Sequence, residues 1–80
     1  MAPKPDRQQL GQALAGARLR RGFSVEEAAA ATQHEPRSLR NWEGGRTSPD
    51  ALALLALADL YGISLEALVG RAPLPPRGQA

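Results

Sequence analysis

The strongest constraint on this chain lies in residues 22–49, GFSVEEAAAATQHEPRSLRNWEGGRTSP, which carry start and stop signals for two short helices. Ser24 with Glu27 fits a capping box, in which each side chain binds a free backbone amide at a helix start. The alanines that follow favour a helix over about 25–32 and allow a neighbouring helix to approach closely. The stretch therefore predicts a short helix that ends a few residues before the next one begins.

The second short helix is predicted over about 36–43. Pro36 suits the first helical position, where its missing N–H is not needed, and this makes Glu35 the N-cap. Leu39 and Trp42 share one helix face and should point toward a core. A pair of glycines then ends the helix. Two short helices joined by a tight turn predict a helix-turn-helix, a unit that presents its second helix to the DNA major groove.

Three further helices complete the predicted all-α fold, a compact bundle of five short helices, and they span about 6–21, 49–61 and 65–69. Asp6 with Gln9 fits a second capping box. Ser48 is the expected N-cap of the fourth helix, with Pro49 at its first position. Ser64 is the expected N-cap of the last helix.

The fourth predicted helix is apolar almost all the way round. At helical spacing, one arc contains Ala51, Leu54, Leu55, Leu57, Ala58 and Tyr61. The apolar residues outside that arc are Leu52, Ala53, Ala56 and Leu60. In a small domain this pattern predicts burial on two sides, one against the core and the other against the fifth helix or a second subunit.

Length and composition limit the remaining possibilities. The 80 residues suit one domain over about 6–70, with a loose arm at 1–5 and a disordered tail rich in Pro and Gly at 71–80. With no cysteine and one histidine, we expect no metal and no cofactor. No apolar run is long enough for a bilayer, and the N-terminus lacks the pattern of a secretory signal, so we expect a cytoplasmic protein without membrane contact.

The net charge is only +2, so the positions of the charged residues say more about a partner than their total does. Six arginines lie in or beside the predicted DNA-facing half: Arg18, Arg20, Arg21, Arg37, Arg40 and Arg46. The C-terminal part carries Asp50, Asp59 and Glu66. A surface polarised in this way suits an anionic partner. The alternative is that the arginines simply coat helix surfaces.

Four segments together resemble the Cro/lambda-repressor-like helix-turn-helix family: Arg18, GFSVEE, LRNWEGGRTSP and LADLYGISLEAL. The resemblance covers about residues 7–70. It implies a bundle of four or five helices that acts as a prokaryotic or phage transcription regulator, often as a dimer on a palindromic operator. It also implies base-reading positions at Glu35, Pro36, Arg37 and Asn41, and an ion pair between Arg18 and Glu43.

The chemistry of the second short helix partly agrees with this resemblance. Arg37 could bind O6 and N7 of a guanine, and Asn41 could bind N6 and N7 of an adenine. Phosphate contacts are expected from Arg40, Arg46, Ser24 and Arg21. Simpler roles stay open, namely a solvated face for the arginines, a surface polar residue for Asn41 and helix capping alone for Ser24.

Three departures from the family pattern weaken the DNA interpretation. Val25 stands where the family often has a glutamine that contacts a phosphate. Gln33-His34-Glu35 replaces the common Gly-Val-Ser of the turn, and Glu35 brings negative charge to the expected DNA edge. Pro36 removes an amide donor. His34 is either a buried turn residue, a phosphate contact or a pH-sensitive group.

Two functions follow, and no catalytic or small-molecule site is evident. The leading one is a sequence-specific transcriptional regulator that binds double-stranded DNA as a homodimer. The alternative is a protein-interaction module of the same fold, such as an antitoxin or phage-encoded modulator, with weak or no DNA binding. The candidate dimer or partner surface lies on the fourth and fifth helices and comprises Leu60, Leu65, Leu68 and Val69.

Overall fold

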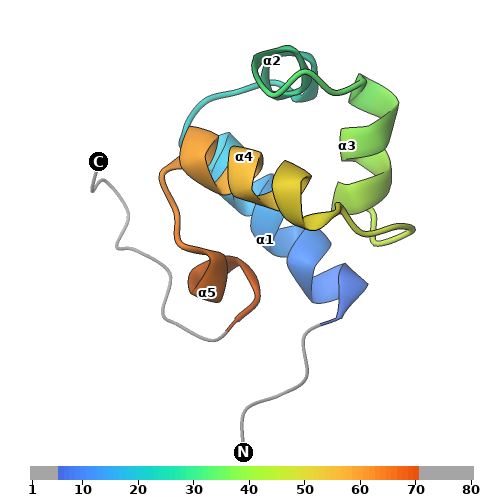
Figure 1. Cartoon of the computed structure of the whole chain (residues 1–80), viewed down its shortest axis with the longest axis vertical. Coiled ribbons are helices and arrows are strands. Elements are labelled where there is room, and N and C mark those ends of the chain that lie inside the picture. Colours follow the sequence, from blue (N-terminus) through green and yellow to red (C-terminus); the bar gives the residue numbers. More distant parts are fainter. Residues whose placement is uncertain (1–5, 71–80) are drawn as a thin grey trace, which may run out of the picture.

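Five helices make up most of residues 6–70, the part of the chain that the computed structural model describes. They are α1 (Arg7–Arg20), α2 (Val25–Ala31), α3 (Pro36–Glu43), α4 (Ala51–Tyr61) and α5 (Leu65–Leu68). Helix α1 is central, because it packs against α3, α4 and α5, while α2 packs against α3 and α4 (Figure 1). The predicted all-α fold is confirmed for these residues. The predicted arm at 1–5 and tail at 71–80 lie outside them.

Most of the predicted helix starts are confirmed by hydrogen bonds. The Ser24 hydroxyl accepts a bond from the Glu27 amide at 3.0 Å, and the Ser24 amide donates to the Glu27 carboxylate at 2.8 Å. Asp6 accepts from the Gln9 amide at 2.8 Å, although Gln9 does not complete a box. Ser64 accepts from the Ala67 amide at 3.1 Å. Short polar side chains thus set where these three helices begin.

The predicted start of α4 is wrong. The helix begins at Ala51 rather than at Pro49, and Asp50 rather than Ser48 is the N-cap. The Asp50 carboxylate accepts a hydrogen bond from the Ala53 amide at 2.8 Å. Aspartate caps as well as serine does, and its negative charge adds a favourable interaction with the helix dipole.

The other predicted helix ends differ by at most one residue. The segments predicted to end at 21, 32 and 69 each end one residue earlier, because Arg21, Thr32 and Val69 are C-caps. The bounds predicted for α3, 36–43, agree with the structure.

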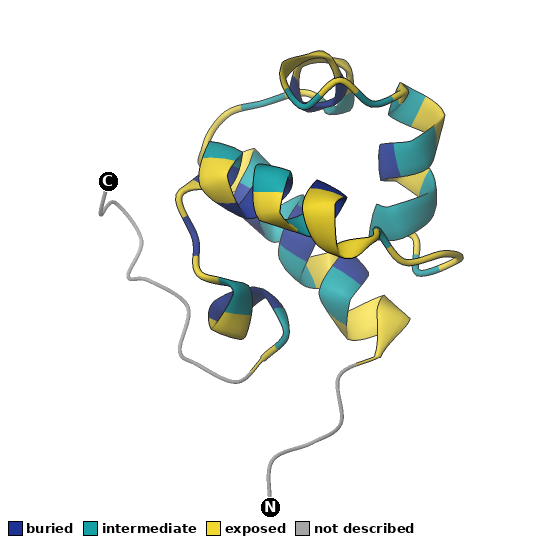
Figure 2. Cartoon of the chain, in the orientation of Figure 1, coloured by how far each residue is buried: buried dark blue, intermediate teal, exposed yellow. Residues whose placement is uncertain are grey.

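The core draws one fully buried leucine from each of four helices. These are Leu14, Leu39, Leu57 and Leu68, from α1, α3, α4 and α5. Helix α2 contributes Ala28 and Ala29 instead, both with no exposed surface. Small side chains at these two positions allow α2 to lie close to its neighbours, as the alanine run predicts. The buried residues line the inner faces of the helices (Figure 2).

The expected burial of α4 on two sides is not found within residues 6–70. Leu55, within the predicted arc, is 45% exposed, and Leu52, outside that arc, is 79% exposed. Ala53, which also lies outside the arc, is buried. A helix that is apolar all round has no dominant inward face, so its sequence alone cannot fix its rotation.

Helix α1 crosses α3 at Gly11, whose side chain position is filled by the backbone of α3. A Cβ built on Gly11 would lie 2.5 Å from the carbonyl oxygens of both Trp42 and Glu43. Such an approach is possible only because glycine has no Cβ. The contact sets how closely the last turn of α3 lies against α1.

Gly11→Ala should therefore destabilise the protein by about 2 kcal/mol or more, since two backbone carbonyls must move. Gly16→Ala in the same helix is the matched control, because its nearest atom is an Arg20 side-chain nitrogen at 4.0 Å. That control should gain roughly 0.5–1 kcal/mol from alanine's helix propensity. Urea unfolding of both variants tests this, and equal stabilities would contradict the contact.

Tyr61 at the end of α4 gives stability a dependence on alkaline pH. Its ring lies 6.2 Å from that of Phe23, and burial raises its pKa from 10.0 to about 12, with a smaller effect from the charge of Glu43. The unfolded chain would lose this proton first as the pH rises. The stabilisation is thus complete below about pH 10 and is lost as the pH rises toward about 12.

We expect the free energy of unfolding to fall by up to roughly 2 kcal/mol across that pH range. Tyr61→Phe has no phenol to ionise and should show a flatter profile over the same range. Urea unfolding at several pH values measures both proteins. Parallel profiles for the two proteins would show that another group causes the loss.

Candidate nucleic-acid interface

The turn between α2 and α3 fixes how α3 leaves the body of the protein. Gln33 has a positive φ of 60°, which is unusual for a residue with a side chain. The His34 amide donates to the Ala29 carbonyl at 2.8 Å and closes the turn. The left-handed position explains why the family often has glycine where this chain has Gln33.

His34 is half-buried and lies against α3, the candidate recognition helix. Its ring meets Trp42 edge to face, with ring centroids 5.2 Å apart, and its Nδ1 lies 3.3 Å from the Thr32 hydroxyl. Trp42 in turn packs against the core. This geometry favours the buried-turn role for His34 over a phosphate contact, and it places Trp42 in the packing rather than on the outer face.

Arg18 and Glu43 join the end of α1 to the end of α3. Arg18 Nε and Nη2 donate to the two carboxylate oxygens of Glu43 at 2.8 and 3.0 Å, and Nη1 donates to the Phe23 carbonyl at 2.9 Å. The two side chains are only 12% and 13% exposed. The hydrogen bond to Glu43 raises the pKa of Arg18 further above its ordinary value. A forked pair with these extra bonds holds α3 in one orientation.

Glu43→Gln should destabilise the protein by about 2–4 kcal/mol, because it leaves the largely buried Arg18 charge without a counter-charge. Glu66→Gln on α5 removes the same charge from an exposed side chain and should change stability by no more than roughly 0.5 kcal/mol. Thermal or urea unfolding compares them. Similar stabilities for the two variants would show that the pair does not hold α3.

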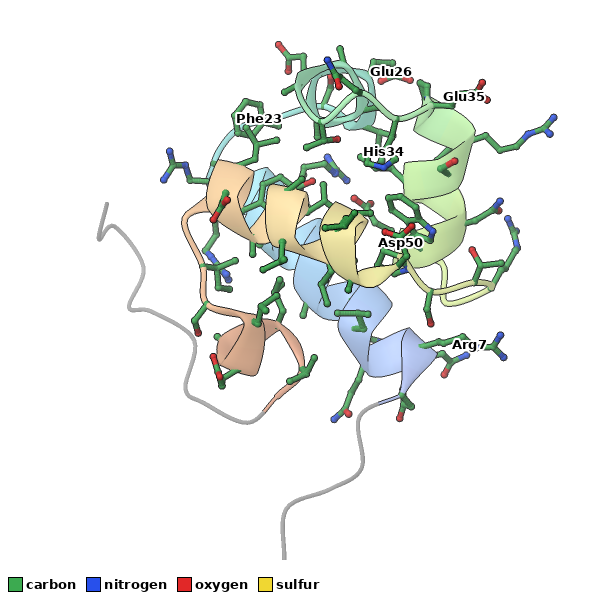
Figure 3. The ribbon with its side chains drawn as sticks, viewed as in Figure 1. Arg7, Phe23, Glu26, His34, Glu35 and Asp50 are labelled. Carbon is green, nitrogen blue, oxygen red and sulfur yellow. The ribbon has the colours of Figure 1, made fainter. Side chains whose placement is uncertain are left out.

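The outer face of α3 carries the four residues expected to contact bases. Arg37 is exposed and lies one turn before Asn41, so the two share a face. Asn41 is half-buried, and its side-chain oxygen accepts a hydrogen bond from Arg46 Nη1 at 3.3 Å. Glu35 is exposed at the N-cap without a side-chain capping bond, and Pro36 follows it at the first helical position (Figure 3). All four therefore lie on α3 or at its start.

Arg40 differs from Arg37, because it already has an anionic partner. Its Nη2 donates to the carboxylate of Glu26 on α2. The side chains of Arg40 and Glu26 are 55% and 61% exposed. The pKa of Glu26 is lowered, first by a hydrogen bond from its own backbone amide and then by the bond from Arg40. Glu26 is therefore charged at neutral pH, and it lies with Glu35 on the edge where α2 meets α3 (Figure 3).

The remaining expected phosphate contacts do not all lie together. Arg46 is exposed in the loop after α3. Arg21 lies apart from it, because a Cβ on Gly62 would be 3.0 Å from the Arg21 guanidinium. The Ser24 amide is taken by the carboxylate of Glu27, so it is not free for a phosphate. Arg46 adjoins the face that carries Arg37 and Asn41, because its Nη1 donates to the Asn41 side chain.

Arg7 joins this surface, although it was not among the residues predicted from the sequence. Its Nη1 donates to the backbone carbonyl of Arg46 at 3.1 Å, a contact between residues 39 apart in sequence (Figure 3). The start of α1 thus adds a second cation beside the loop that follows α3. Its charge was the only available signal, because the contact depends on how α1 packs against α3.

The candidate dimer residues need one correction. Leu68 is 1% exposed and belongs to the core, so it cannot form a contact surface. Leu60, Leu65 and Val69 are half-buried and remain candidates. The large apolar side chains that are exposed within residues 6–70 lie elsewhere, at Leu19, Leu52 and Leu55.

No group of three or more His, Asp or Glu side chains in the described part of the chain could hold a metal ion. None of the helices described here is both long and apolar enough to cross a bilayer.

Comparison with known proteins gives a consistent result. A family model described as a helix-turn-helix domain matches residues 9–72. The HTH-type transcriptional regulator ImmR of Bacillus subtilis is 36% identical over 62 residues, which cover 78% of this chain and 49% of ImmR. The chain therefore spans about half the length of that curated relative.

Solved structures share the fold. The clp gene regulator ClgR from Corynebacterium glutamicum matches with a TM-score of 0.77 and 28% identity, over 86% of this chain and 74% of ClgR. The DNA-binding domain of BldD from S. venezulae matches with a TM-score of 0.69 and 26% identity, over 79% of this chain and 94% of that domain. The controller protein C.AhdI from Aeromonas hydrophila, at 24% identity and a TM-score of 0.71 over 76% of this chain and 92% of C.AhdI, shows the fold alone.

Proposed function

This chain belongs to the Cro/lambda-repressor-like helix-turn-helix family, a family of transcriptional regulators, and on that premise we propose that it binds double-stranded DNA in a sequence-dependent way. In this proposal α3 enters the major groove, and the bound protein controls transcription by occupying an operator. BldD, whose solved domain is described as DNA-binding, supports the proposal by its similarity to this chain.

The observation that carries the proposal is the outer face of α3. Arg37 and Asn41 lie one turn apart on that face, while Leu39 on the opposite side is 1% exposed. The pair between Arg18 and Glu43 fixes the end of the same helix. A short helix that packs on one face and carries polar residues on the other suits insertion into a groove. The packed face keeps the base-reading groups in a fixed orientation.

Arg37 and Asn41 have different parts in this proposal. Arg37 is exposed and suits a two-bonded contact to guanine. Asn41 must exchange its weak bond with Arg46, 3.3 Å long, for a contact to adenine. Release of Arg46 would allow its guanidinium to reach a phosphate beside Arg7. Glu35 would accept a bond from a cytosine amino group, and Pro36 would contribute only apolar contact.

Binding as a homodimer is the second part of the proposal. One copy places few cations on the backbone, so useful affinity is expected to need two copies on half-sites about one helical turn apart. Leu60, Leu65 and Val69, which are half-buried at the α4–α5 end, are the proposed contact surface. Selection of bound sites from random DNA would recover a palindrome if the protein binds in this way.

Arg37→Ala and Asn41→Ala should each weaken binding to a selected site by about 1–3 kcal/mol and relax the preference at one base position. Arg20→Ala is the matched control, because Arg20 is an exposed arginine on α1 that is not among the residues expected to contact bases. Fluorescence anisotropy with the selected site and with single-base variants measures both effects. If Arg37→Ala and Asn41→Ala behave like Arg20→Ala, α3 does not read the DNA.

A second candidate function has some support from the charges. Glu26 is bound to Arg40, and Glu35 is exposed, so the α2–α3 edge is less cationic than its arginines suggest. This favours a protein-interaction module of the same fold. A salt titration separates the two, because DNA binding weakens linearly in log–log form with added salt, whereas an apolar protein interface responds little.

A further inference from the structure

Residues 6–70 contain two ion pairs that differ sharply in exposure. The pair between Arg18 and Glu43 is 12% and 13% exposed, whereas the pair between Arg40 and Glu26 is 55% and 61% exposed. Both join α3 to another helix, but only the second lies on the edge where α2 meets α3 (Figure 3). The first is placed to fix the fold. The second is open to solvent and to any ligand that approaches that edge.

We infer that the Glu26 carboxylate competes with DNA phosphates for Arg40, so that this residue sets how tightly the protein holds DNA of any sequence. The inference rests on the proposed function. In the free protein the carboxylate takes the place of a phosphate on the guanidinium. On DNA, a phosphate must displace the carboxylate, or the two anions must share the arginine.

The exposure of the pair makes this exchange feasible. Exposed ion pairs contribute little to stability and are screened by salt, so a phosphate can replace the carboxylate without loosening the fold. A hydrogen bond from its own backbone amide lowers the pKa of Glu26 and does not depend on Arg40. The displaced carboxylate therefore stays charged at neutral pH, and it would repel a phosphate that binds to Arg40.

The effect should fall on the sequence-independent part of binding. Phosphate contacts give affinity without reading bases, whereas contacts to base edges give preference. Arg40 is involved with Glu26, while Arg37 is exposed and Asn41 contacts Arg46. Removal of the Glu26 charge should thus raise affinity for all duplexes by a similar factor and leave the base preference unchanged.

The test compares Glu26→Gln with Glu66→Gln, which makes the same change of charge on α5, on a 20-base-pair duplex of the selected sequence and on one of unrelated sequence. We expect Glu26→Gln to bind both duplexes roughly 3- to 5-fold more tightly at low salt. The slope of log K against log salt should steepen by up to about 0.9, because no displaced carboxylate is left to take up a cation when Arg40 binds a phosphate. Glu66→Gln should differ little from the wild type.

Arg40→Gln, alone and combined with Glu26→Gln, shows whether the effect passes through the pair. The gain from Glu26→Gln should disappear when Arg40 is absent, because no guanidinium is released. Thermal unfolding should show all these variants folded at the assay temperature. A gain that persists without Arg40, or one equal to that of Glu66→Gln, would overturn the inference.

The outcomes also separate this inference from the proposed function. If the wild type binds the selected duplex and Glu26→Gln leaves affinity and salt slope unchanged, the competition is absent while DNA binding stands. If neither protein binds any duplex in the selection, the proposed function fails and the inference fails with it.

Discussion

The forked ion pair between Arg18 and Glu43 is the interaction on which the arrangement of this domain most depends. It joins the end of the central helix to the end of the helix that faces outward, and a third bond from Arg18 holds the Phe23 carbonyl before α2. One guanidinium thus connects α1, α3 and the segment that leads into α2. Both side chains are largely buried, so either charge would destabilise the protein if it lost its partner.

Local signals in the sequence were sufficient to predict where the helices lie along the chain. They were not sufficient to predict how each helix is rotated or where two helices cross. The capping box at Ser24 and Glu27 has a fixed spacing, so it could be recognised directly. The N-cap of α4 is Asp50 where Ser48 was expected, because aspartate and serine cap about equally well and the sequence near a helix start does not say which of two such residues is used. The exposure of Leu55 and the close contact at Gly11 depend on the packing of distant segments, which leaves no local pattern.

The candidate DNA-binding surface could likewise be predicted only where helical spacing decides the arrangement. Arg37 and Asn41 could be assigned to one face from helical spacing, and the structure places them on one face of α3. The roles of Arg7 and Glu26 could not, because each contacts a residue far along the chain. The arginines in the sequence overstated the positive charge of the edge where α2 meets α3, because the sequence could not show that Arg40 has the Glu26 carboxylate beside it.

The backbone contact at Gly11 has a consequence for how this surface can evolve. Helix α3 rests on α1 through the carbonyl groups of Trp42 and Glu43, which every amino acid possesses. The packing of α3 against α1 at this point therefore does not depend on the side chains on the outer face of α3. If α3 reads DNA as proposed, substitutions at Arg37 or Asn41 would change the base preference without disturbing this backbone contact. The preference for a target sequence could then change while the packing of α3 on α1 stays the same.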